Sequence, residues 1–198
     1  MLLFITVLML NVWTTMTASL FSPNINIIEE LEKIKNMETK IKSMEQEIER
    51  LKAENAGRVK VAFSTSLSDS SGMIYIGPFA QETDLVYNKI FTNIGNAYDC
   101  DTGIFTAPVK GVYFFNLVLF TNDAVSAGVK LLRNGKLVVG VTDNPPEKKG
   151  DYEDTASNSV SLLLEEGDQI SLKLLENRRI YTDGFKRNTF SGHLLFTI

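Results

Sequence analysis

The sequence predicts an all-β sandwich preceded by a single long helix. Two observations support this fold class. A seven-residue repeat of apolar side chains runs between residues 27 and 54 with no glycine or proline inside it. After residue 58 the apolar residues alternate with polar ones, in short runs separated by turn-forming residues, which is typical of a sandwich of short strands.

The first segment of the chain has the composition of a secretory signal. Leu2–Val12 is almost wholly apolar, and Thr14–Ser19 is small or polar apart from Met16. This pattern predicts a signal peptide over residues 1–18 and a secreted, extracellular protein. The alternative is an N-terminus that anchors the chain in a membrane. No run of 18 or more apolar residues occurs, so we expect no membrane-spanning helix.

The heptad repeat predicts a coiled coil over residues 27–54. With Ile27 at position a, isoleucine recurs at every a position, and position d holds methionine or leucine after one faulty place at Glu30. The g and e positions carry opposite charges, as parallel neighbours require. The alternative is a lone amphipathic helix packed on the following domain. The seam residues are compatible with a coiled coil of two or three helices. The predicted oligomerisation seam is Ile27, Ile34, Met37, Ile41, Met44, Ile48 and Leu51.

The remaining elements are strands of a domain that we place at residues 58–198, after a helix stop at Gly57. Residues 59–63 alternate strictly. Residues 112–120 are apolar on both parities apart from one asparagine, which predicts a strand buried on both faces. Two hairpins follow, one around Asn134-Gly135 and one around residues 165–168. The last strand covers residues 190–198.

Composition and motifs exclude several classes of function. The net charge of −4 argues against nucleic-acid binding, which needs concentrated Lys and Arg. No phosphate-binding or nucleophile-elbow motif occurs. Residues 99–110 begin like a helical calcium loop, but Lys110 occupies the place of the bidentate carboxylate, so such a loop is rejected. A calcium site built from several loops stays open, and one cysteine with one histidine makes zinc unlikely.

Cys100 is the single cysteine of the chain, so no intrachain disulfide can form. A catalytic thiol would need a base, and the only imidazole is His193 in the last predicted strand. A free thiol in a sandwich is more often a small, partly buried residue. Pairing between chains is the other interpretation, because an odd cysteine in a secreted protein suggests it. We therefore assign no catalytic residue.

A set of aromatic, asparagine and glycine residues follows a fixed spacing through Tyr87, Asn93, Tyr98, Phe105 and Gly111 and continues in residues 112–115. This spacing closely resembles the signature of the complement C1q globular-head domain. The family pattern favours Phe where this chain has Tyr87, and Phe or Tyr where it has Leu117. Three further segments resemble the family: residues 156–158, 167–170 and 188–196.

This resemblance implies a jelly-roll sandwich of the kind also found in tumour-necrosis-factor ligands, assembled as a homotrimer. It also implies a secreted recognition module that is not an enzyme. We assign no cofactor, and a calcium site stays open. Many members carry a collagen stalk, but this chain has no Gly-x-y repeat, and the heptads stand in its place. Cerebellin-type members carry cysteines ahead of the head, and this chain has none there.

Two functions fit these expectations. The first is multivalent recognition of microbial or altered-self surfaces in innate immunity, a pattern-recognition role whose partner is a microbial glycan or lipid surface. The alternative is an extracellular ligand of a host cell-surface receptor, as in cerebellin-like or adiponectin-like signalling. A loop at residues 177–188 combines basic and aromatic residues that suit an anionic surface. The candidate ligand residues are Arg178, Arg179, Tyr181, Phe185, Lys186 and Arg187.

Overall fold

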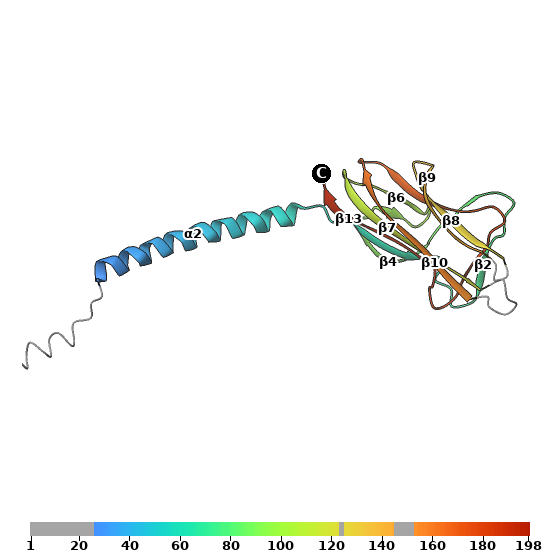
Figure 1. Cartoon of the computed structure of the whole chain (residues 1–198), viewed down its shortest axis with the longest axis horizontal. Coiled ribbons are helices and arrows are strands. Elements are labelled where there is room, and N and C mark those ends of the chain that lie inside the picture. The colour runs from blue at the N-terminus through green and yellow to red at the C-terminus, as the bar shows by residue number, and fades with distance from the viewer. Residues whose placement is uncertain (1–25, 123–124, 145–152) are drawn as a thin grey trace, which may run out of the picture. The chain divides into compact units, whose positions relative to one another are not determined.

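The computed structural model describes residues 26–122, 125–144 and 153–198 (Figure 1). The predicted signal peptide lies outside these residues. Helix α2 covers Ile27–Gly57, and a compact β unit covers Val59–Ile198. Among the described residues, no helix is both long enough and apolar enough to cross a membrane.

Helix α2 forms because its residues are good helix formers without an internal glycine or proline, and it ends at Gly57 as expected. No residue of α2 is buried in the single chain. Its side chains pair along the helix: Lys33 lies 2.8 Å from Glu30, and Arg50 lies 2.7 Å from Glu47. These pairs leave the apolar seam uncovered.

The β unit is a sandwich of antiparallel sheets. The five-stranded sheet has the order β10-β7-β13-β1-β4, and the six-stranded sheet has the order β5-β6-β11-β8-β9 with β3 added on β11. A third, two-stranded sheet pairs β12 with β2. The strands are β1 Ala62–Ser66, β2 Ile74–Ile76, β3 Thr83–Asp84, β4 Lys89–Ile94, β5 Tyr98–Asp99, β6 Ile104–Thr106, β7 Gly111–Asn122, β8 Ala127–Arg133, β9 Lys136–Asp143, β10 Glu153–Leu164, β11 Gln169–Leu174, β12 Ile180–Thr182 and β13 Thr189–Thr197.

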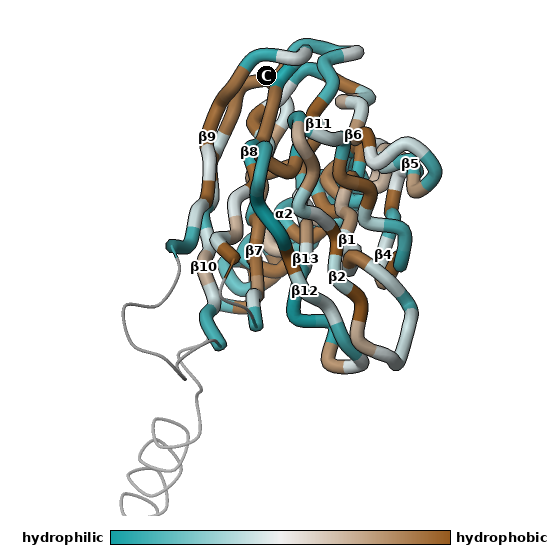
Figure 2. Tube along the Cα trace, turned by 90° about the vertical axis from the view of Figure 1, so that its right-hand side faces the viewer, coloured by the Kyte–Doolittle hydropathy of each residue, from teal (hydrophilic) through white to brown (hydrophobic). Residues whose placement is uncertain are grey.

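The core between the two main sheets is largely aromatic, and Figure 2 shows brown, hydrophobic stretches within the strands and teal at several connecting turns. Phe63 is central. Its ring stacks on Tyr98 at 4.8 Å and on Phe105 at 5.3 Å, and meets the edge of Phe190 at 4.9 Å. Offset and edge-to-face pairs of this kind stabilise a core beyond the area that they bury.

The signature residues read from the sequence are the frame of this core. Asn93 binds both backbone groups of Tyr98, donating to its carbonyl at 2.8 Å and accepting from its N–H at 3.3 Å. The Tyr98 hydroxyl donates to the carbonyl of Tyr87 at 2.9 Å. A side chain at Gly111 would meet the carbonyl of Phe196 at 2.6 Å, so only glycine fits there. These residues hold the sheets together.

The strand at residues 112–120 differs from its prediction in an informative way. Its inward residues, including Tyr113 and Phe115, are fully buried. Its outward residues Val112, Phe114 and Val118 are only partly covered in the single chain. Burial on both faces was predicted, and the single chain provides it on one face.

Candidate functional site

The outer face of the five-stranded sheet is an apolar and small-polar surface. On it, Phe114 of β7 lies between His193 of β13 and Ser161 of β10, and its ring is 5.5 Å from the imidazole. Toward one end, Val112 lies between Leu163 and Phe196. The last two side chains are 47% and 57% exposed.

The other half of this face is lined by small polar residues. Asn116 lies between Ser191 and Ser159, and the next strand places Ser64 beside Ser191. Within the described parts of these strands, the ion pairs of this sheet lie at its ends, on Lys89 and Glu153, and not in the middle of the face. An apolar end and an uncharged middle are features of a surface that another protein covers.

The pairing of β1 with its neighbours shows which segments lie at which end of the sandwich. Ala62 at the start of β1 pairs with His193 and Ile94, whereas Ser66 at its end pairs with Thr189. The segments at residues 67–73 and 183–188 therefore lie at the opposite end from the point where the chain enters the β unit. The predicted ligand residues are at that far end.

The segment 177–188 is more ordered than the predicted loop. It contains β12, which pairs with β2, and it places Tyr181 in the interior, 4% exposed and packed on Tyr75 at 5.1 Å. The buried amide of Asn188 receives the N–H of Phe120 at 3.0 Å and donates to the carbonyls of Phe120 and Tyr181. This amide ties the segment to β7.

The basic side chains of the segment have partners within the protein. Lys186 donates to the carbonyls of Ser68 and Ser70 and lies 3.2 Å from Asp69. Arg187 stacks over Phe120 at 4.2 Å and pairs with acidic residues on either side, Glu153 and Asp183.

The two other arginines are partly covered. Arg179 lies over the ring of Tyr75 at 5.0 Å. One guanidinium nitrogen of Arg178 is buried, and no described residue accepts a hydrogen bond from it. Phe185 is different, because 79% of its side chain is exposed. Of the six candidate ligand residues, it is the one most open to a partner.

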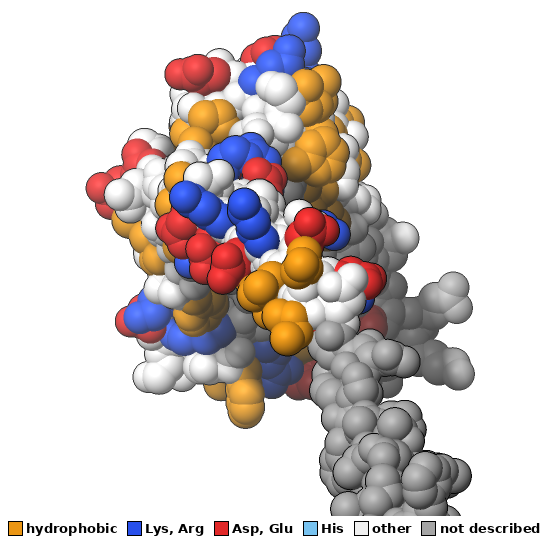
Figure 3. Space-filling view, turned by 90° about the vertical axis from the view of Figure 1, so that its left-hand side faces the viewer, with side chains coloured by type: hydrophobic (Ala, Val, Ile, Leu, Met, Phe, Trp, Pro, Cys, Tyr) orange, Lys and Arg blue, Asp and Glu red, His pale blue; other side chains and the backbone are white. Residues whose placement is uncertain are grey.

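Basic and acidic side chains are interspersed with hydrophobic ones on the side of the molecule shown in Figure 3. The whole chain carries a net charge of −4. This net charge gives little support to simple long-range attraction of an anionic surface.

The structure does not bring Cys100 and His193 together. Cys100 lies in the turn between β5 and β6 of one sheet, whereas His193 lies on β13 of the other. Among the described residues, no group of three or more His, Cys, Asp and Glu side chains is arranged to hold a metal ion. Neither a thiol–imidazole pair nor a metal cluster is therefore formed by these parts of the chain.

A family model described as the C1q domain matches residues 62–195. Over 117 residues, the chain is 38% identical to Complement C1q tumor necrosis factor-related protein 3 of both human and mouse. The alignment covers 59% of this chain and 46% of each relative, so the chain spans about half the length of the curated relatives it matches.

Solved structures of the same fold were also found. The globular domain of zebrafish complement 1qA protein is 19% identical with a TM-score of 0.53, covering 70% of this chain and 100% of that one. Eiger TNF from S. frugiperda is 15% identical with a TM-score of 0.54, covering 71% and 96%. Murine APRIL is 12% identical with a TM-score of 0.53, covering 69% and 99%. At these identities the likeness shows the fold alone, and it confirms the predicted sandwich. The predicted N-terminal helix is confirmed by α2 itself.

Proposed function

This chain belongs to the C1q domain family of non-enzymatic binding proteins, and we propose that it is a secreted homotrimer that recognises surfaces by multivalent binding. The observation that carries this proposal is the uncovered outer face of the five-stranded sheet. The apolar sequence of residues 112–120 is typical of a strand that is buried on both faces. In the single chain, its outward residues Val112 and Phe114 are only partly covered. A second copy of the chain supplies the missing cover.

The helix supports the same assembly independently. Its seam residues are 46–68% exposed in the single chain, from Ile34 to Ile27. Burying the exposed half of such a side chain is worth about 0.7–1.5 kcal/mol, half the value for full burial of a large apolar side chain. Parallel association of the helices covers the stripe and gathers the β units, with their far-end segments turned away from the chain entry points.

Gathering several weak sites suits a repetitive target. Two or more linked sites bind a repeating surface about 10²–10⁴-fold more tightly than one site when the geometry permits simultaneous contact. We propose microbial or altered-self surfaces as the target, with Phe185 as the most accessible contact of the candidate segment. The neighbouring basic residues Lys186 and Arg187 hold the segment in place through their contacts with other residues of the same chain.

The test combines mass and binding. Light scattering coupled to size exclusion should give a trimer, and the protein should bind bacteria and lipopolysaccharide. Phe185→Ser should weaken that binding, and Arg178→Ala with Arg179→Ala should weaken it further by loosening the segment. Lys136→Ala, at an exposed position of a different hairpin, is the control. A stable monomer would overturn the proposed assembly, and undiminished binding by all variants would overturn the proposal for this segment.

A second candidate function is a ligand of a host receptor, as in cerebellin-like or adiponectin-like signalling. The 38% identity to proteins named as tumor necrosis factor-related favours it. Surface pull-down from host cells separates the two functions. One saturable host receptor together with no microbial binding would favour the second candidate.

A further inference from the structure

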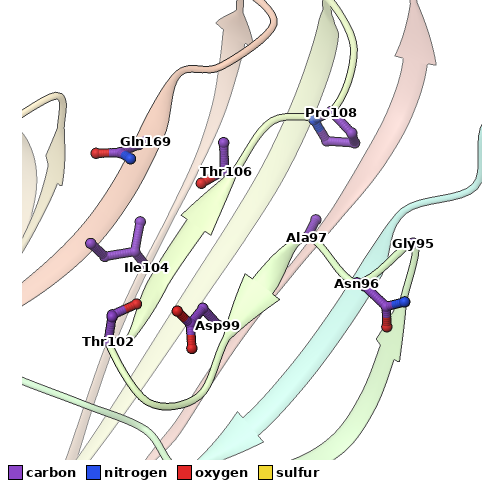
Figure 4. A pocket seen from close by; sticks show the side chains of 9 residues that line it. All are labelled: Gly95, Asn96, Ala97, Asp99, Thr102, Ile104, Thr106, Pro108 and Gln169. Carbon is purple, nitrogen blue, oxygen red and sulfur yellow. The ribbon is translucent and has the colours of Figure 1, made fainter.

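A pocket of about 480 Å³ lies on the outer face of the six-stranded sheet, near its β5 edge. Figure 4 shows the side chains that line it, which come from β5, β6, the start of β11 and the turns beside them. Its volume falls in the range of small-molecule sites. Residues 95–108 provide most of the lining, and Gln169 comes from a distant part of the sequence.

The alternation of strand residues builds this pocket. Tyr98 and Phe105 point into the core, so Asp99, Ile104 and Thr106 point outward. Asp99 pairs across the sheet with Ile104, and Thr106 pairs with Gln169. The same aromatic signature that frames the core therefore fixes the positions of the outward side chains.

Several hydrogen-bonding groups around the pocket are unused. Within the described part of the chain, the side chains of Asn96, Thr106 and Gln169 make no hydrogen bond. Asp99 accepts from the N–H of Asp101 at 2.8 Å and is also bonded by Thr102, which together hold its carboxyl pKa below the usual value. Asp99 is thus a fixed carboxylate, and it is the one charged side chain in the lining.

We propose that this pocket binds a single neutral saccharide ring. The amides, the hydroxyl and the carboxylate can both donate to and accept from neighbouring sugar hydroxyls. Ile104 and Pro108 supply an apolar surface for the carbon face of the ring. The carboxylate disfavours anionic sugars and phosphates, because like charges repel at short range.

The pocket is on a different sheet from the face that the proposed homotrimer covers. This inference deepens the proposed recognition function by naming a ligand class, and it adds a site separate from the segment at residues 177–188.

Saturation-transfer difference NMR on the full-length protein tests the inference with free methyl glycosides of glucose, galactose, mannose and N-acetylglucosamine. At least one should give a saturable signal at millimolar concentration. The paired change Thr106→Val with Gln169→Ala should weaken that binding by about 4- to 100-fold, since each lost hydrogen bond costs about 2- to 10-fold. Sialic acid should give no signal at this site.

Thr142→Val is the matched control, because Thr142 is an exposed threonine of β9 at the far edge of the same sheet. It should leave binding unchanged. No signal from any neutral glycoside, stronger signal from sialic acid, or equal binding by the paired variant and the control would overturn the inference. A protein that is trimeric and binds bacteria yet ignores all four glycosides refutes this pocket alone, whereas a monomer that binds a glycoside refutes only the proposed assembly.

Discussion

Replacing Ile34 and Ile41 by glutamate should dissociate the helical stem. In the single chain, 46% of Ile34 and 51% of Ile41 are exposed, and the rest is already covered by the helix itself. Association can therefore bury only about half of each side chain. Full burial of an isoleucine is worth about 1.5–3 kcal/mol, so each contributes about 0.7–1.5 kcal/mol to association. Six such side chains in a homotrimer together contribute about 4–9 kcal/mol. Losing this term weakens association of the stem by about 10³–10⁶-fold.

The glutamates add a further cost, because a charge buried without a partner is strongly unfavourable. The assay is light scattering coupled to size exclusion over a dilution series, with the helical signal followed on heating. Asn36→Glu with Ser43→Glu is the control, since it adds the same charges at two c positions of the heptad, away from the seam.

The expected result is a loss of mass on dilution, or a stem that melts early while the β units remain associated. The control should behave as the parent. If the double-glutamate variant keeps the parent mass at every concentration and melts at the same temperature, the apolar stripe is not an association seam.

Three changes in the β unit test its packing by chemical denaturation. Tyr87→Phe should raise the free energy of unfolding by up to about 1 kcal/mol, because its buried hydroxyl has no partner among the described residues; a loss of stability would contradict this. Gly192→Ala should cost about 1–3 kcal/mol, because the new Cβ would lie 2.6 Å from the ring of Phe115, and an unchanged midpoint would refute it. Asp168→Asn should destabilise the protein at neutral pH but not in acid. Asn134 is the main cause of the lowered Asp168 carboxyl pKa, so the parent's advantage should be complete above about pH 4 and disappear at lower pH; a pH-independent difference would count against it.

Much of the fold could be predicted because local and global signals agree. The heptads specify the helix, Asn134-Gly135 specifies a hairpin, and the aromatic spacing specifies the core. The signal peptide and the oligomerisation seam stay predictions, since no described contact tests them.

The candidate ligand segment was harder to predict, because composition does not show which charges are already paired. Lys186 and Arg187 read as free cations in the sequence, yet their partners come from distant residues such as Asp69 and Glu153. The pocket was missed for the same reason: Gln169 joins Thr106 only through the pairing of β11 with β6. The alternation of inward and outward residues around Tyr98 was the one signal in the sequence that could have indicated which side chains face outward into the pocket.

The two ends of the β unit leave the sandwich on the same side. The N–H of Leu194 donates to the carbonyl of Val61 at 2.9 Å, and that of Ile198 donates to Lys110 at 3.4 Å. A fluorescent protein, an affinity tag or a biotin fused after Ile198 would therefore emerge beside the residues where the chain enters the β unit. Tethering the β unit through the residues after Ile198 leaves the segments at residues 67–73 and 183–188 at the opposite end of the sandwich, which suits the β unit to display on a sensor surface.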